Sequence, residues 1–246
     1  MEATREELLI SVLADILAED RHIAVGAASP IPGAAALLSR AENAEKGRRV
    51  QVSILHSRRH NPFTAGSREL FDLAARGAID SFFLGGVQID GQANINLVGL
   101  GDPPGSKKRF PGSFGSALMY YVVPKVILFR EEHSPRTLVE RVDFVSAPGV
   151  SPPGAHRPGG PHALVTNRCV MGFDRAAGRF NLRSTHPGET VEGIAEATGF
   201  SFDSAGDEPE TQGPTPARLT RIREEIAPQV ASFYPEFAKR LWGMAA

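Results

Sequence analysis

The chain has 246 residues, 41% of them hydrophobic, which is enough to bury a core in one large domain or two small ones. Its 27 basic and 28 acidic residues give a formal charge of −1, and this balance disfavours nucleic-acid binding. No apolar run approaches the ~20 residues that span a membrane, and the polar N-terminus is unlike a secretory signal. With a single cysteine, Cys169, no internal disulfide can form, so we expect a cytoplasmic protein, and no metal-ligand spacing is present.

The first third of the chain alternates between helical and extended patterns. Residues 4–18 have the apolar spacing of an amphipathic helix, which begins with a capping box between Thr4 and Glu7. Short apolar segments predict strands at 22–25, 50–55 and 81–84, and residues 33–39 and 67–75 predict the helices between them. This order predicts a parallel sheet with right-handed crossovers.

The rest of the chain predicts further strands and a long loop. Extended segments are expected at 125–129, 137–145, 163–166, 168–173 and 179–184, and a loop rich in proline and glycine covers 147–162. Thr190 and Pro216 each begin a predicted helix, and an amphipathic segment runs to Trp242. We therefore expect one α/β domain over residues 1–246, with an open, mostly parallel sheet flanked by helices and a C-terminal helical segment.

Residues 85–96, Gly-Gly-Val-Gln-Ile-Asp-Gly-Gln-Ala-Asn-Ile-Asn, are the most informative stretch. Apolar residues alternate with polar ones on either side of the Asp90-Gly91 turn, as in two paired strands. Gln88, Asp90, Asn94 and Asn96 then gather near the end of the sheet. Two interpretations remain open: the wall of a binding site, or a polar hairpin that satisfies its own hydrogen bonds.

Other segments carry weaker signals. Residues 25–30 follow a predicted strand and precede a helix, so small residues such as Gly26 let a ligand approach the backbone, although a tight turn is the simpler interpretation. Residues 111–115 could form a nest of N–H groups for an oxyanion. His56 and His60 follow the second strand at its carboxyl end, where open α/β sheets bind ligands, and His56 could act as a general base.

These segments, in this order, resemble the β subunits of class I CoA-transferases, close to the glutaconate CoA-transferase branch, over nearly the whole chain. The matching segments are 25–30, 85–90 with 94–96, 111–115, His133 with 138–144, 159–161 before 165–166, 186–192 and 198–200. The resemblance implies an open α/β sheet that works next to a homologous α subunit, as an α2β2 heterotetramer with acyl-CoA bound between the chains. CoA would be part of the substrate, and no further cofactor is expected.

The resemblance also identifies a missing residue. Transferases of this family use a glutamate at the end of the second strand, which attacks the thioester and carries the acyl and CoA groups in turn. Here His56, Ser57 and Arg58 follow that strand, and no glutamate is present. The chain therefore looks like a branch without this glutamate, the ring-opening hydrolases of steroid (cholesterol) degradation. In that branch the α subunit supplies the catalytic glutamate, and water cleaves a carbon–carbon bond of a cyclic β-dicarbonyl CoA thioester.

The leading hypothesis is therefore the β subunit of a CoA-dependent C–C hydrolase. Its candidate catalytic residues are His56, Ser57, Gln88 and Asp90, and the candidate substrate- or CoA-binding residues are Gly26, Ser29, Pro30, Asn94, Asn96, Gly112, Ser113 and Gly115. Three alternatives remain: a true CoA-transferase whose nucleophile lies elsewhere, a non-catalytic chain that completes the partner's site, and, more distantly, a sugar-phosphate isomerase.

Overall fold

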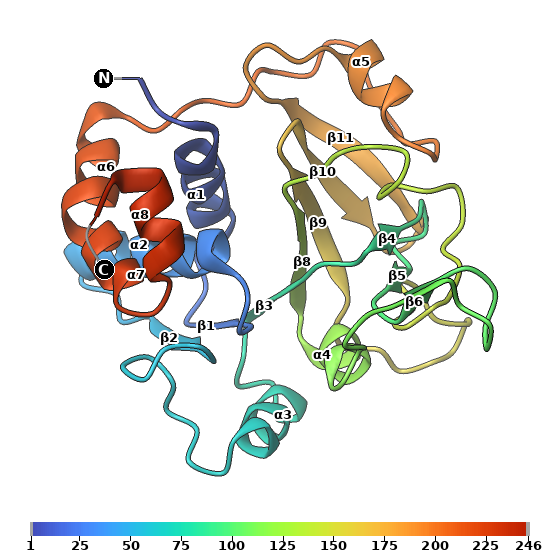
Figure 1. The fold of residues 1–246 in the computed structure, drawn as a ribbon, viewed down its shortest axis with the longest axis horizontal. Helices are drawn as coiled ribbons and strands as arrows, with labels where there is room; N and C mark the ends of the chain where they lie inside the picture. The colour runs from blue at the N-terminus through green and yellow to red at the C-terminus, as the bar shows by residue number, and fades with distance from the viewer. Residues whose placement is uncertain (1, 245–246) are drawn as a thin grey trace. The chain divides into compact units, whose positions relative to one another are not determined.

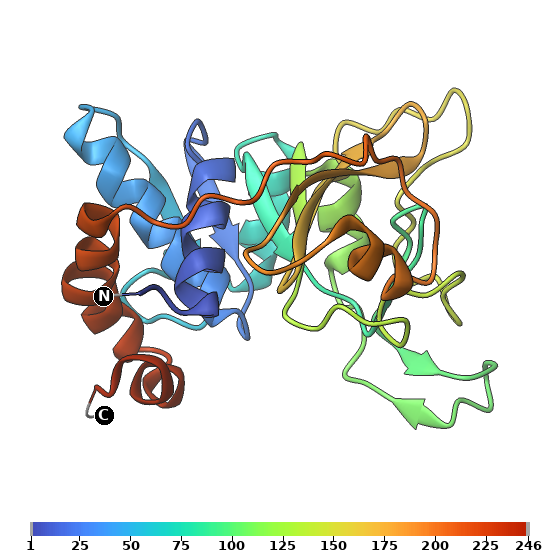
Figure 2. The same cartoon turned by 90° about the horizontal axis from the view of Figure 1, so that it is seen from above.

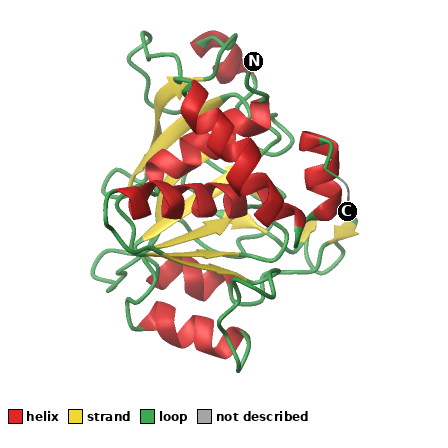
Figure 3. Ribbon diagram, turned by 90° about the vertical axis from the view of Figure 1, so that its left-hand side faces the viewer, coloured by secondary structure: helices red, strands yellow, loops and turns green. Residues whose placement is uncertain are grey.

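The computed structural model describes residues 2–244, which form two compact units (Figure 1). Unit 1 contains the residues up to Leu70, Ala78–Phe83 and the residues from Gln212 onward, and unit 2 contains Phe71–Gly77 and Leu84–Thr211. The chain consists of strands and helices joined by loops, as the colouring in Figure 3 shows. The predicted α/β class with a mostly parallel sheet is confirmed, whereas the single domain over 1–246 stays a prediction.

Unit 1 is built on three short parallel strands. β1(His22–Val25) pairs with β2(Gln51–Ile54) on one side and with β3(Ser81–Leu84) on the other, so β2 is an edge strand. β1 and β3 are buried over their whole length, which explains why their sequences show no polar alternation. The capping box predicted at Thr4 is present at the start of α1(Arg5–Ile16).

The second helix of unit 1 is longer than expected. α2(Pro30–Glu45) begins at Pro30 rather than after Pro32, because a proline in the first turn sacrifices no helical hydrogen bond. Its alanine- and leucine-rich first half is buried, and the helix continues well beyond Ser39. Only the first residues of α3(Ser67–Ala75) belong to unit 1.

The C-terminal helical segment returns to α1 and α2. It comprises α6(Pro216–Arg221), a π-helical turn η1(Ile222–Ile226), α7(Ala227–Ala231) and α8(Pro235–Trp242). Figure 2 shows these red helices beside the blue N-terminal ones. The Arg218 guanidinium pairs with Glu42 of α2 at 2.7 Å, and Arg223 pairs with Glu7 of α1 at 2.7 Å.

Unit 2 contains a four-stranded group and small hairpins. β8(Lys125–Arg130) runs parallel to β9(Pro161–Thr166), which is followed by antiparallel β10(Cys169–Asp174) and β11(Arg179–Thr185). The hairpins pair β4(Gln88–Ile89) with β5(Ile95–Asn96) and β6(Gly99–Leu100) with β7(Lys108–Arg109). Two short helices, α4(Ser116–Val122) and α5(Val191–Glu196), complete the unit, and Thr190 caps α5 as predicted.

One predicted extended segment is wrong. Residues 137–145 form no strand, because Thr137 and Leu138 are drawn into a turn by hydrogen bonds to the Ser134 carbonyl. Only a single bridge, Ile89 to Leu138, joins this segment to β4. The long loop over 147–162 is confirmed up to the start of β9. Between residues 2 and 244, no helix combines the length and apolar character needed to cross a bilayer.

We expect Glu7→Gln to destabilise unit 1 by about 3 kcal/mol, because the buried Glu7 carboxylate accepts charge-assisted hydrogen bonds from Arg223 and further bonds from Thr4 and Trp242. Burial raises the pKa of Glu7, but the hydrogen bonds from Arg223 and Thr4 outweigh it and hold the pKa below its usual value. Urea unfolding at pH 7 measures the change. Glu19→Gln, which removes an 80%-exposed partner of Arg48, should cost less than about 1 kcal/mol. Equal losses for the two variants would contradict this assignment.

Candidate functional site

The loops after β1 and β2 meet at the carboxyl ends of these strands in unit 1. His56 lies on the loop after β2, with its side chain exposed. Its ring stacks on Tyr234, with ring centroids 5.1 Å apart and planes inclined by 9°. His56, which follows the strand at which family transferases are expected to carry their glutamate, therefore packs against the C-terminal segment at Tyr234, the residue before α8.

Tyr234 also fixes the loop after β1. Its hydroxyl donates to the Ala27 carbonyl at 2.6 Å and accepts the Ser29 N–H at 3.1 Å. Burial raises the pKa of Tyr234, so the phenol stays protonated and remains a donor at neutral pH. Sequence reasoning missed this residue, since the only signal was an aromatic residue directly before Pro235 at a helix start.

Ser57 shapes the loop after β2 from inside. Its side chain is 2% exposed, and its hydroxyl accepts the His60 N–H at 3.1 Å. The same turn is closed by the Ile54 N–H, which donates to the His60 carbonyl at 2.9 Å. Ser57 therefore stabilises the turn that follows His56, whereas direct participation of Ser57 in catalysis stays a prediction.

A mostly apolar cavity of about 460 Å³ opens beside His56. It is lined by Ala27, Ala28, Pro30, His56, Phe233, Tyr234, Pro235, Glu236 and Phe237. The structure thus brings His56 together with the predicted binding residue Pro30, while Gly26 and Ser29 reach this site through Tyr234. Glu236, a carboxylate that no sequence motif indicated, lies on the same wall.

Gln88 and Asn96 form a closed pair in unit 2. The Asn96 amide donates to the Gln88 side-chain oxygen at 2.8 Å and to the Gly99 carbonyl at 2.7 Å. The Gln88 oxygen also accepts the Asp143 N–H at 2.9 Å, and the Asn96 oxygen accepts the N–H groups of Val98 and Gly99. Both side chains are buried, so this geometry favours the hairpin interpretation for them.

Asp90 and Asn94 brace the same hairpin but reach a surface. Asp90 accepts the backbone N–H groups of Gln92 and Asn94 through one oxygen and the Asn94 amide through the other. The Asn94 oxygen accepts the Gly149 N–H at 3.1 Å. Unlike Gln88 and Asn96, both line a cavity of about 750 Å³ in unit 2. Asp90 and Asn94 are therefore accessible to a ligand in this cavity, and their role in binding stays a prediction.

The predicted nest at 111–115 is a turn that leads into α4. Gly112 has φ +96° and open space around its α-carbon, which suits a left-handed turn. A β-carbon on Gly115 would lie 2.0 Å from the Phe71 ring, so only glycine fits there. The Ser116 N–H donates to the Ser113 carbonyl at 2.6 Å. The backbone conformation of Gly112 and the close approach of Phe71 to Gly115 explain why both residues are glycine. Ligand binding at this turn stays a prediction.

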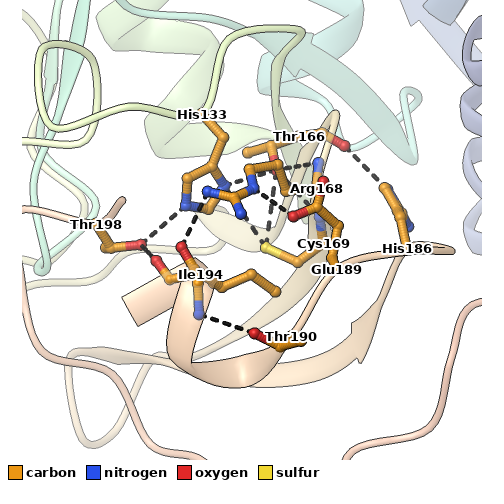
Figure 4. Close-up of polar contacts among 10 residues, drawn as sticks. His133, Thr166, Arg168, Cys169, His186, Glu189, Thr190, Ile194 and Thr198 are labelled. Atoms are coloured by element: carbon orange, nitrogen blue, oxygen red, sulfur yellow. Dashed lines mark hydrogen bonds and ion pairs between the residues drawn. The ribbon is translucent and has the colours of Figure 1, made fainter. Parts of the chain in front are cut away.

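Several of the family-like segments meet in a buried polar network in unit 2 (Figure 4). His133 contacts the Thr166 hydroxyl at 2.8 Å and the Thr198 hydroxyl at 2.9 Å. Since Thr198 donates to the Ile194 carbonyl, it accepts from His133, and Thr166 donates to the other ring nitrogen. Arg168 pairs with Glu189 at 2.6 Å. The network ties the segment 186–198 to β9 and β10.

Cys169 lies in this network and is not a nucleophile candidate. Burial raises the pKa of its thiol to about 12, so the thiolate is scarce at neutral pH. Its sulfur lies 3.7 Å from the Thr166 hydroxyl. Among residues 2–244, no three His, Cys, Asp or Glu side chains are grouped as metal ligands would be.

A model of the coenzyme A transferase family matches residues 13–197, from α1 through α5. The chain belongs to the coenzyme A transferase family. The match includes the loops after β1 and β2, the hairpin of β4 and β5, and all labelled residues of the Figure 4 network except Thr198. It ends before the C-terminal helices that carry Tyr234 and Glu236.

Three curated relatives are similar in sequence. The B subunit of 3-oxoadipate CoA-transferase from Pseudomonas knackmussii is 35% identical over 60% of this chain, and the B subunit of glutaconate CoA-transferase from Acidaminococcus fermentans is 34% identical over 59%. The IpdB subunit of the cholesterol ring-cleaving hydrolase from Rhodococcus jostii is 30% identical over 66%. The matches span 58%, 56% and 65% of these relatives, less than two thirds of their length.

Solved structures of two of these proteins share the fold. The A. fermentans glutaconate CoA-transferase superposes with a TM-score of 0.80 at 24% identity, covering 94% of this chain and 97% of that one. R. jostii IpdAB gives a TM-score of 0.80 at 24% identity, covering 98% and 99%. The family and fold expected from the sequence are confirmed, and the two enzymes carry out different reactions.

We expect His133→Gln to flatten the dependence of stability on pH below neutrality. Burial, reinforced by Arg168, lowers the pKa of His133 to about 4, so between pH 6.5 and 4 the unfolded chain binds more protons than the folded one. The contribution of His133 to the free energy of unfolding is therefore complete above pH 6.5 and falls by about 2 kcal/mol by pH 5. Gln keeps a donor and an acceptor but does not titrate.

Urea unfolding at pH 7.5 and pH 5 measures the effect. The exposed His156 provides the matched control, since His156→Gln should leave the pH dependence of the parent protein intact. A pH dependence that is the same in His133→Gln and in the parent would show that His133 does not set it.

Proposed function

We propose that this chain is the β subunit of a heteromeric hydrolase that opens a cyclic β-dicarbonyl CoA thioester of steroid degradation by hydrolytic C–C cleavage. A homologous α subunit, in an α2β2 assembly, supplies the catalytic glutamate. The similarity to the IpdB subunit supports the reaction class, and CoA enters as part of the substrate with no additional cofactor.

The observation that carries the proposal is the residue after β2. His56, rather than a carboxylate, stands there, stacked on Tyr234 at the mouth of an apolar cavity. An imidazole cannot form the acyl anhydride and glutamyl thioester through which a transferase passes CoA. It can hydrogen-bond a water molecule or a carbonyl oxygen, which is what hydrolysis requires.

The proposed ring opening needs no co-reactant other than water. Water adds to a ring carbonyl, the adjacent C–C bond breaks, and its electron pair passes to the second carbonyl as an enolate. The enolate then takes a proton, and the attacked carbon becomes a carboxylate. In this scheme the partner's glutamate accepts the water proton, His56 orients water or substrate, and the apolar wall holds the ring.

A second candidate function rests on Glu236. This exposed carboxylate lines the same cavity as His56 and lies in the first turn of α8. A CoA-transferase reaction with Glu236 as nucleophile is therefore the specific rival, and it agrees with the similarity to the two CoA-transferases. A chain that only completes the partner's site is the remaining alternative.

The reaction type is tested with the α and β chains produced together. The complex is incubated with a cyclic β-diketone acyl-CoA in isotopically labelled water, and products are identified by mass spectrometry. We expect label in a ring-opened product that still carries CoA. Movement of CoA to an added carboxylate without ring opening would overturn the hydrolase proposal.

Two variants separate the candidate groups. We expect His56→Ala to lower kcat at least about tenfold, since general acid–base or hydrogen-bonding help is lost, while Glu236→Gln keeps nearly full activity. If Glu236→Gln abolishes turnover and the parent forms a glutamyl-CoA adduct that borohydride reduces, the transferase function holds instead. Unchanged turnover in His56→Ala, Gln88→Ala and Asp90→Ala would make the chain a non-catalytic partner.

We further expect Tyr234→Phe to lower activity about tenfold with little change in KM. The ring still stacks on His56, but the loop over 26–29 loses the hydroxyl that holds Ala27 and Ser29. Steady-state kinetics of the complex measures this, with Tyr121→Phe as the control because the Tyr121 hydroxyl bonds to the His156 carbonyl and not to the loop over 26–29. Equal activity of the two variants would argue against a positioning role for the Tyr234 hydroxyl.

A further inference from the structure

A second cavity in unit 1, of about 470 Å³, lies along β2. Its lining residues are Arg21, Arg40, Arg49, Val50, Gln51, Val52, Arg59, His60 and Pro62. Four of these nine are arginines and none is acidic, although the whole chain carries a formal charge of −1. Such a local excess of positive charge creates a positive potential that attracts anions to the cavity.

The arginines differ in how far they are neutralised. Arg21 pairs with Asp80 at 3.1 Å, and the half-buried Arg40 donates to the Gln229 side chain at 3.2 Å. Arg49 and Arg59 are exposed, and neither has a hydrogen bond or ion pair with any residue between 2 and 244. Burial and the nearby Arg59 charge lower the pKa of Arg40, so these cations repel one another.

His60 adds an unsatisfied donor to this wall. Its side chain is only 6% exposed, and its Nδ1 lies 3.5 Å from the Arg40 guanidinium. Since a guanidinium only donates, Nδ1 accepts and the ring hydrogen sits on Nε2. That Nε2 is buried, and no residue from 2 to 244 accepts a hydrogen bond from it, which costs free energy until an acceptor arrives.

We propose that this cavity is a binding site for a phosphate-bearing anion held by Arg49, Arg59 and the Nε2 hydrogen of His60. Apart from the Gln51 amide and His60 Nδ1, which already faces Arg40, every side-chain polar group on the wall is a donor, so the ligand must present several acceptor oxygens. Arginine forks suit the geometry of phosphate oxygens, and phosphate carries more charge than a single carboxylate. The cavity volume admits a group as large as a pyrophosphate with part of a nucleoside.

Anion binding at this cavity does not depend on the reaction proposed for the His56 cavity. The phosphates could belong to the nucleotide end of a CoA thioester or to a separate phosphorylated molecule, and both present the same chemistry to the arginines. If the hydrolase proposal fails, the anion site can still stand, because its test measures binding rather than turnover.

Calorimetric titration of the purified chain with inorganic pyrophosphate at low ionic strength tests the site. We expect saturable binding that weakens about tenfold in Arg59→Gln and in Arg49→Gln. Arg58→Gln is the matched control, because Arg58 is exposed on the same loop but does not line the cavity. No binding by the parent protein, or equal weakening in Arg58→Gln and Arg59→Gln, would overturn the proposal.

A second readout locates the ligand at His60. Burial, together with the charges of Arg40 and Arg59, lowers the pKa of His60 to about 4, and Glu225 lies near Arg40 as the opposing charge. Bound pyrophosphate offsets the two arginines, so we expect this pKa to rise by at least about one unit in NMR titrations assigned with His60→Gln. Binding that leaves it unchanged would place pyrophosphate elsewhere.

Competition then identifies the source of the phosphates. Displacement of pyrophosphate by CoA supports the site and assigns it to the nucleotide end of CoA. Pyrophosphate binding that CoA does not displace supports the site and assigns it to a separate phosphorylated molecule.

Discussion

The attachment of the C-terminal helices to α1 and α2 is the constraint on which the His56 cavity depends. Two arginines of the helical segment, Arg218 and Arg223, pair with Glu42 and Glu7, and these contacts fix the path of the chain as far as Tyr234. Tyr234 then holds the loops after β1 and β2 with one side chain. A site whose residues come from both ends of the chain can form only after those ends have docked.

Much of the fold could be predicted because local signals and tertiary packing agree. The capping box at Thr4, the strand over 22–25 and the Asp90-Gly91 hairpin are decided by neighbours in sequence, and all three are present. The segment 137–145 failed because its extended pattern is overridden by a turn at Ser134. Of its apolar residues, Leu138 and Val142 are buried singly, whereas Phe144 and Val145 are exposed, so no continuous strand face forms.

The candidate site was harder to predict, because the sequence shows which polar groups exist but not which ones satisfy each other. Gln88 and Asn96 alternate with apolar residues as site residues would, yet they bond to each other and to the backbone. His56 was identified by its place after a strand and by the family resemblance. Tyr234 and Glu236 lie some 180 residues further along the chain, so only the folded structure brings them to His56.

The position of β2 at the edge of the sheet has a consequence for the protein's behaviour at high concentration. An unprotected edge strand offers N–H and C=O groups to other molecules and promotes aggregation. Here the loop after β2 folds back, so that the Ile54 N–H is occupied by the His60 carbonyl. The unpaired charges of Arg49 and Arg59 lie beside the rest of this edge, so pairing of two copies through β2 would bring like charges together, which opposes association by this edge.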